Sequence, residues 1–214
     1  MKIISVILAR GGSKGIPNKN IIDINGKPLI AYTILASIKS KVQQTWVSTD
    51  SDKIKKTANS YGALTLDRPK EISGDFSQSE EALIHFSHNI DFDILVFIQP
   101  TSPLIKSKDL NNGIEMITNS NTPLDSVFSV YKEHWVPRWD LNIKPSNWDI
   151  NNRPMRQEVN DKYVENGAFY ITTRESLLKS NLRYSGKLGI VEMPISRSFQ
   201  IDSTDDIKLI RKLL

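Results

Sequence analysis

The chain has 214 residues, of which 39% are hydrophobic and 24% charged, with ten glycines and ten prolines. This length suits one domain with its own core, and the composition excludes disordered, fibrous and collagen-like classes. The formal charge of +4 is spread over both halves of the sequence, which disfavours a nucleic-acid partner and suits a small anionic substrate.

Strands and helices are predicted to alternate along the first half of the chain. Residues 3–9 form a short apolar run rich in β-branched side chains, typical of a strand buried on both faces. The following spacing predicts helix 28–37, strand 46–49, helix 52–61, strand 63–66, helix 79–90 and strand 93–98. This order indicates a Rossmann-like, three-layer α/β/α fold with a mostly parallel central sheet and ligands at the carboxyl ends of its strands.

The second half continues this pattern, breaks it and then resumes it. The predicted elements are helix 108–118, strand 126–131, strands 167–172 and 188–193, and a closing helix 203–214. Residues 132–162 show no clear period and hold three of the four tryptophans. Because a structureless loop of that length is uncommon inside a compact domain, we interpret it as an excursion that packs on another surface, such as a second subunit.

The chain has no cysteine, which excludes disulfides and thiolate chemistry and is compatible with a reducing cytoplasm. Its first ten residues, MKIISVILAR, are too short in apolar length for a signal peptide, and no stretch approaches the roughly 18 apolar residues of a membrane span. We therefore expect a cytoplasmic protein with no membrane partner.

A glycine-rich loop directly follows the first predicted strand. It reads Arg10-Gly11-Gly12-Ser13-Lys14-Gly15 and continues to Lys19. Glycines let the backbone approach a ligand, and the three basic side chains add positive charge, so the loop has the features of a polyphosphate site. It matches neither a Walker A loop nor a dinucleotide fingerprint. On the glycines alone, a basic surface turn is an equally good interpretation.

Further short motifs follow this loop along most of the chain. They are LARGGSKGIPNKN at 8–20, VSTD at 47–50, DRP at 67–69, QPTSP at 99–103, RQE at 156–158, NGAFYI at 166–171 and IDSTDD at 201–206. Together they resemble the cytidylyltransferases that activate sialic acids and related nine-carbon 2-keto acids as CMP-sugars. Related enzymes for the eight-carbon acid Kdo carry a Gln-Gly-Asp-Glu-Pro-like segment in place of QPTSP, which favours the sialate branch.

The resemblance implies that residues 1–214 form a single nucleotidyltransferase domain. Its reaction would convert CTP and a nine-carbon 2-keto-3-deoxy sugar acid, such as neuraminic, legionaminic or pseudaminic acid, to CMP-sugar and pyrophosphate. It also implies Mg²⁺ as cofactor and a homodimer, with 132–162 as a dimerisation segment or substrate lid. Two alternatives stay open: a cytidylyltransferase for a different acid, such as Kdo or an amino-modified Kdo, and a non-catalytic nucleotide-binding paralogue.

Roles for individual residues follow from the same resemblance. The phosphates of CTP would be bound by the loop residues Arg10, Gly11, Gly12, Ser13, Lys14 and Lys19. Catalysis would depend on Arg10 and Lys14, whose charge offsets that of the leaving pyrophosphate, and on Asp202. Cytosine and ribose would be held by Asn20, Arg68 and Ser79. The sugar acid would contact Gln99, Thr101, Ser102, Arg156, Gln157 and Asn166.

Asp202 matches an acid that ligates Mg²⁺ in this family, but the sequence departs from the usual pattern of two acids, Asp-x-Asp. This chain reads Gln200-Ile201-Asp202. Magnesium commonly takes only one or two protein carboxylates, so a single aspartate can suffice. Two groups remain alternatives for deprotonating the sugar hydroxyl, namely Asp202 and a metal-bound hydroxide. Related enzymes also place a lysine near the sugar, for which Arg138 can substitute here.

Overall fold

The computed structural model describes residues 1–119, 121 and 123–214. Within these residues one central sheet is built from β1 (Ile3–Leu8), β4 (Gln44–Thr49), β5 (Leu64–Asp67), β6 (Ile94–Ile98), β7 (Ser126–Glu133), β8 (Lys162–Thr173) and β9 (Leu188–Glu192). Their order in the sheet is β5-β4-β1-β6-β8-β7-β9. Strand β8 runs antiparallel to β6 and β7, and the other pairings in the sheet are parallel. The prediction of a mostly parallel sheet is confirmed.

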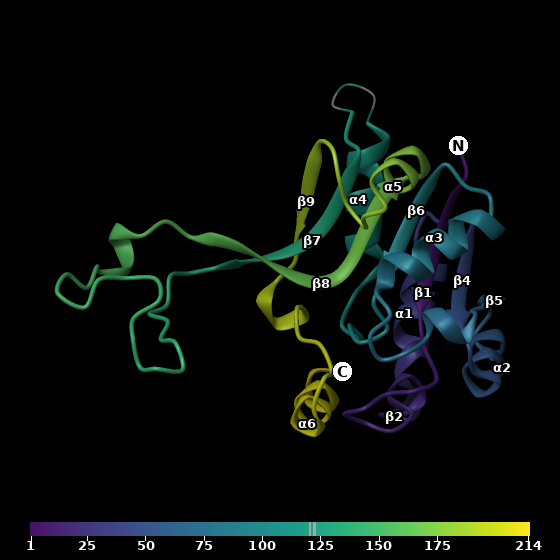
Figure 1. Ribbon diagram of the computed structural model, residues 1–214, viewed down its shortest axis with the longest axis horizontal. Coiled ribbons are helices and arrows are strands. Elements are labelled where there is room, and N and C mark those ends of the chain that lie inside the picture. Colours follow the sequence, from purple (N-terminus) through teal and green to yellow (C-terminus); the bar gives the residue numbers. More distant parts are fainter. Residues whose placement is uncertain (120, 122) are drawn as a thin grey trace.

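Helices cover both faces of this sheet (Figure 1). One hydrophobic cluster joins the sheet to α1 (Leu29–Ile38), α2 (Asp52–Ser60) and α4 (Ser107–Thr118). The opposite cluster joins it to α3 (Ser79–Asn89) and α5 (Arg174–Ser180). The fold is therefore the predicted Rossmann-like, three-layer arrangement. None of the helices in the described ranges is long and apolar enough to cross a membrane.

The burial of β6 explains why its sequence reads as a continuous apolar run. Ile94, Val96 and Ile98 point to the face that carries α1 and α4. Leu95 and Phe97 point to the face that carries α3. Because successive side chains of a strand alternate between the two faces, a strand covered on both sides needs an apolar residue at every position.

The last helix, α6 (Thr204–Leu213), lies beside a small hairpin of β2 (Asp23–Ile24) and β3 (Lys27–Pro28) (Figure 1). A third apolar cluster joins this helix to residues after the glycine loop. The helix begins where Ser203 accepts a hydrogen bond from the backbone N–H of Asp206 and the Asp206 carboxylate accepts one from the N–H of Ser203. Short 3₁₀ turns occupy Lys19–Ile21, Lys70–Ile72, Arg156–Glu158 and Ile195–Arg197.

Strands β7 and β8 extend beyond the sheet as a ribbon, and residues 134–161, which we call the arm, project away from the body (Figure 1). The predicted break in pattern at 132–162 corresponds to this arm. Its regular structure is limited to two isolated bridges and one short 3₁₀ turn in the part of the chain described. Exposed apolar side chains along the arm are those of Val136, Trp139, Leu141, Ile143, Ile150 and Met155.

Candidate functional site

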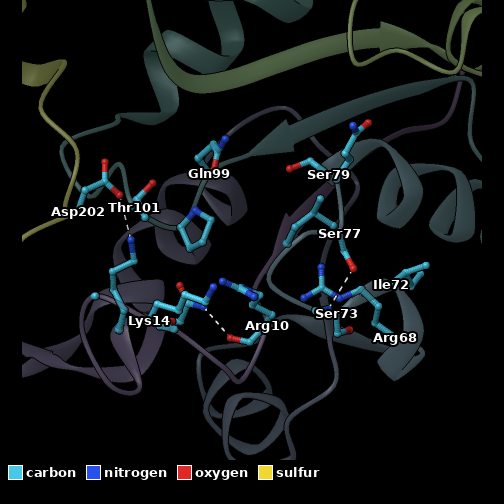
Figure 2. A pocket seen from close by; sticks show the side chains of 18 residues that line it. Arg10, Lys14, Arg68, Ile72, Ser73, Ser77, Ser79, Gln99, Thr101 and Asp202 are labelled. Atoms are coloured by element: carbon cyan, nitrogen blue, oxygen red, sulfur yellow. Dashed lines mark hydrogen bonds and ion pairs between the residues drawn. The ribbon is translucent and has the colours of Figure 1, made fainter.

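A cavity of about 400 Å³ opens at the carboxyl ends of β1, β5 and β6. Parallel strands direct the residues that follow them to one edge of the sheet, and the cavity lies at that edge. It is lined by Leu8, Arg10, Ser13, Lys14, Gly15, Lys19, Asn20, Arg68, Ile72, Ser73, Gly74, Ser77, Gln78, Ser79, Gln99, Pro100, Thr101 and Asp202. Figure 2 shows Asp202 and Thr101 on one side of this cavity and Arg68 and Ser77 on the other.

The glycine loop is held against the end of β4. The backbone N–H of Gly11 donates to Oδ1 of Asp50 at 2.8 Å, and a Cβ atom on Gly11 would lie 2.9 Å from Cβ of Ser51. Only glycine allows this close approach without displacing its neighbour. The buried Asn20 donates from Nδ2 to the carbonyl of Arg10 at 3.0 Å. These contacts fix the start of the loop, from which Arg10 reaches the cavity.

The cations of the loop already have an anionic partner. Arg10 Nη1 lies 2.7 Å from Oδ1 of Asp75, and Lys14 Nζ lies 3.1 Å from the other oxygen of the same carboxylate. The hydrogen bonds from Arg10 and Lys14 hold the pKa of Asp75 below its ordinary value. The two cations are thus arranged around one group of anionic oxygens, which is the geometry that a phosphate group requires.

Arg68 is the most deeply buried cation of the cavity wall, with 8% of its surface exposed. Its Nε and Nη2 atoms are buried and make no hydrogen bond within the described ranges. Burial lowers the pKa of Arg68, while nearby Asp50 partly offsets this effect. Because buried donors without acceptors are costly, this guanidinium is suited to a ligand that brings oxygen or nitrogen acceptors.

Asp202 faces the cavity beside Lys19. Lys19 Nζ donates to Oδ1 of Asp202 and to the carbonyl of Ile201, each at 3.0 Å. The other acids of the IDSTDD motif are used elsewhere, because Asp206 caps α6 and Asp205 pairs with Lys208. No group of three or more His, Asp or Glu side chains able to hold a metal occurs in residues 1–119, 121 and 123–214. Any hard cation at Asp202 would therefore take further ligands from a substrate or from water.

The residues predicted to contact a sugar acid fall into different environments. Gln99 and Thr101 line the cavity, whereas Ser102 is buried and is not among the lining residues. Arg156 and Gln157 are exposed in the 3₁₀ turn Arg156–Glu158 of the arm and are not among the lining residues. Within one chain these two side chains therefore do not meet the rest of the predicted site.

Two other residues from the same predictions make internal contacts. Asn166 is buried, accepts a hydrogen bond from Ser129 at 2.6 Å and donates one to Ser198 at 3.0 Å. Arg138, considered as a substitute for a lysine near the sugar, donates from Nη2 to both carboxylate oxygens of Glu133. Both side chains act here as links between segments of this chain.

Several residues that shape the cavity were not predicted from the sequence. Asp50 ends the VSTD motif and directly follows a predicted strand. This position could have predicted that Asp50 lies at the edge of the sheet where the cavity opens. Asp75 lies in a polar stretch between the DRP motif and α3, where no local pattern indicates a partner. The same stretch contributes Ser73, Gly74, Ser77 and Gln78 to the lining.

Comparison with known proteins gives a family for this chain. A family model described as cytidylyltransferase matches residues 4–213. The chain is 40% identical over 209 residues to N-acylneuraminate cytidylyltransferase A of Danio rerio, covering 94% of this chain and 48% of that protein. It is 32% identical over 226 residues to CMP-N,N'-diacetyllegionaminic acid synthase of Legionella pneumophila, covering 100% of this chain and 97% of that protein. The chain thus spans about half the length of the fish relative and nearly all of the Legionella one.

Solved structures agree with this result at the level of the fold. CMP:2-keto-3-deoxy-manno-octonic acid synthetase complexed with CTP superposes with a TM-score of 0.78 at 19% identity, over 100% of this chain and 98% of that one. A 4-diphosphocytidyl-2C-methyl-D-erythritol synthase from Anaerococcus prevotii gives 0.68 at 15% identity, over 99% and 97%. The family match over nearly the whole length, the relatives and this shared fold lead to one conclusion: the chain belongs to the cytidylyltransferase family.

Proposed function

We propose that this chain transfers the cytidylyl group of CTP to a nine-carbon 2-keto-3-deoxy sugar acid and releases pyrophosphate. The observation that carries this proposal is the cavity wall, where the loop cations Arg10 and Lys14 lie near the buried and unsatisfied guanidinium of Arg68. Such a wall provides positive charge that can bind a triphosphate and hydrogen-bond donors that can bind a base or ribose. The names of the Danio and Legionella relatives support the choice of CTP and of a nine-carbon acid.

The chemistry assigns a task to each cationic residue. The anomeric hydroxyl oxygen of the sugar acid would attack the α-phosphorus of CTP, the bond from that phosphorus to the bridging oxygen would break, and the hydroxyl proton would pass to a base, for which this chain offers Asp202. Arg10 and Lys14 would bind the departing pyrophosphate and offset its growing negative charge. Arg68 would donate to the O2 and N3 atoms of cytosine, which are acceptors. Gln99 and Thr101 would orient the acid from the opposite wall.

We also propose that Mg²⁺ binds at Asp202. A single exposed carboxylate at the edge of a cavity fits a cation that completes its shell with phosphate oxygens and water. When bound, the ion would add positive charge beside the phosphates of the nucleotide. Lys19 would keep the Asp202 carboxylate at the cavity wall.

Eight-carbon acids are the second candidate substrates. The synthetase for 2-keto-3-deoxy-manno-octonic acid shares the fold with this chain, but at 19% identity. The relatives named for nine-carbon acids share 30–40%. This difference favours a nine-carbon acid.

We further propose that the protein acts as a cytoplasmic homodimer in which the arm contacts the second subunit. The support is the set of exposed apolar side chains along the arm, which would be buried against a partner. A partner's arm could also bring the predicted Arg156 and Gln157 to the cavity. Analytical ultracentrifugation of the parent and of a Leu141→Asp, Ile150→Asp variant tests this: we expect a dimer and a monomer, respectively, and a monomeric parent would contradict the proposal.

The catalytic proposal is tested by pyrophosphate release. The protein is incubated with Mg²⁺, with each of CTP, ATP, GTP and UTP, and with neuraminic, legionaminic, pseudaminic and Kdo-type acids. We expect turnover with CTP and a nine-carbon acid, and a large loss in Arg68→Leu. Lys53→Ala, on the exposed face of α2, is the matched removal of a cation outside the cavity and should keep the parent rate. Equal turnover with all four nucleotides, or turnover with Kdo alone, would contradict the proposal.

A further inference from the structure

Gln200 joins the loop after β6, which lines part of the cavity, to β8, which does not line it. Its Oε1 atom accepts a hydrogen bond from Oγ1 of Thr101 at 3.2 Å, and its Nε2 atom donates to the backbone carbonyl of Asn166. Thr101 and Asn166 are both buried. One residue further along the chain, the N–H of Ile201 donates to the carbonyl of Thr101 at 2.9 Å. The side chain of Gln200 is therefore a link between the loop after β6 and the bend in β8.

The bend in β8 is shaped to receive this side chain. Gly167 has a φ of +66°, a conformation that favours glycine. A Cβ atom on Gly167 would lie 2.5 Å from Nε2 of Gln200. The long side chain of Gln200 thus occupies the space that a side chain at position 167 would need.

The link needs the chemistry of an amide. Toward Thr101 it must accept a hydrogen bond, and toward the carbonyl of Asn166 it must donate one. An amide has both an acceptor oxygen and a donor nitrogen, whereas an ionised carboxylate only accepts. A carboxylate at position 200 would place an anionic oxygen against the carbonyl oxygen of Asn166.

We propose that Gln200 is a positioning residue that holds the loop bearing Gln99 and Thr101 against β8 and so sets the sugar-acid side of the cavity. Both of its polar atoms are engaged in this link, so neither is free to ligate a metal. The proposal rests on the proposed function in one respect, namely that Gln99 and Thr101 contact the sugar acid.

The test replaces the donor while keeping the shape. Gln200→Glu should raise the KM for the sugar acid about tenfold, the effect of losing one hydrogen bond, and change the KM for CTP less than twofold. The Mg²⁺ dependence should stay that of the parent.

A matched control lies at the opposite end of the sheet. Gln43 also forms two links with its amide, to the N–H of Ile3 and to the carbonyl of Met1. Gln43→Glu should therefore affect stability without changing either KM. If both variants change both KM values alike, the role of Gln200 is general to the fold and the proposal is wrong.

Hydrogen exchange makes the test independent of catalysis. Gln200→Glu and, as a second variant, Thr101→Val should speed exchange at the amides of Ile201 and Gln99, which are bonded across this link, and leave β1 at the parent rate. Unchanged exchange in both variants, or a lower Mg²⁺ requirement in Gln200→Glu, would overturn the proposal. An inactive parent with the expected exchange pattern would instead refute the proposed function and leave the link established.

Discussion

Arg68 in the cavity wall has 8% of its surface exposed, and two of its buried nitrogen atoms have no hydrogen-bond acceptor in the described residues. Leu141 on the arm, in contrast, is fully exposed. The cavity is lined mainly by polar groups that the body of the protein holds in place. The arm carries several apolar side chains that the body does not cover. The cavity is therefore suited to bind a polar ligand, whereas the exposed side chains of the arm are suited to contact another apolar surface.

The largest expected effect is in stability, and it contrasts the hydrophobic core of the body with the arm. Phe86 is fully buried on α3 and packs against Trp46 and Phe92 with ring centroids about 6 Å apart. Phe86→Ala should lower the free energy of unfolding by about 3–5 kcal/mol, since it removes packing and leaves a void. Leu141→Ala should change it by less than about 0.5 kcal/mol. Urea denaturation at one low protein concentration measures both.

The same two variants, Phe86→Ala and Leu141→Ala, are also compared at higher protein concentration. If the arm is covered by a second copy, the cost of Leu141→Ala should grow with concentration, while that of Phe86→Ala should not. A large cost of Leu141→Ala at every concentration would show that the arm packs on its own body.

The next effect concerns turnover. Arg10→Ala and Lys14→Ala should each lower the rate with CTP by about 10²-fold, the scale of losing one preorganised charge. Folding should be retained, because in the described residues both side chains form ion pairs with the exposed Asp75 alone, and the ring of Phe76 beneath Lys14 is exposed as well. If the folded variants keep rates near the parent value, the glycine loop is a basic surface turn and not a phosphate site.

Local patterns were sufficient to predict the elements that build the body. The apolar runs of β1 and β6 are buried on both faces, and their position in the chain predicted the edge of the sheet where the cavity lies. The predicted helices begin within a residue or so of their observed starts, because serine and proline mark several of them. Helix α5 was not predicted, since seven residues are too few to show a helical period.

Contacts between distant parts of the chain were not predictable in the same way. Asp75 meets Arg10 across 65 positions, and the Gln200 amide meets Thr101 across 99. Neither pairing leaves a periodic signal, because it depends on how the whole sheet brings loops together. The arm projects away from the body (Figure 1), so the sequence indicated an excursion but not where Arg156 and Gln157 lie.

A smaller effect concerns two ion pairs, one in the body and one at the base of the arm. Arg183 binds Glu80 with two hydrogen bonds, and both side chains are largely buried, whereas Arg138, whose side chain is 54% exposed, reaches from the arm to Glu133 of β7. Burial alone would raise the pKa of Glu80, but the hydrogen bond and charge of Arg183 outweigh it, so the pKa is lowered. After allowance for solvent screening, Glu80→Gln should cost about 1–2 kcal/mol at pH 7, and Glu133→Gln should cost nothing measurable.

The pH dependence of this pair has a definite sign. A carboxyl whose pKa is lower in the folded state stabilises the fold at pH values above its unfolded pKa, about 4.3 for glutamate. This stabilisation is lost as the pH falls through the folded pKa. The difference between the parent and Glu80→Gln in urea midpoint should therefore be constant from pH 7 to about 5 and shrink below about 4. A difference that grows on acidification would contradict this assignment.

The smallest expected effect concerns Asp75, whose carboxylate occupies the two loop cations that we assign to phosphate. Arg10 and Lys14 hold its pKa below the ordinary value, so it stays ionised throughout the neutral range. A triphosphate that binds these cations must compete with the Asp75 carboxylate.

Asp75→Asn should therefore lower the Kd for CTP by about two- to fivefold, the range of an exposed ion pair, and this gain in affinity should fade at high salt. Calorimetric titration with CTP measures this, and Asp67→Asn, which removes an exposed partner of Lys55, is the matched control. Weaker binding in Asp75→Asn would mean that the carboxylate orients the cations for the nucleotide. The cavity would then owe its geometry to an internal anion, in contrast to the arm, where Leu141, Ile143 and Ile150 are left exposed by the described residues.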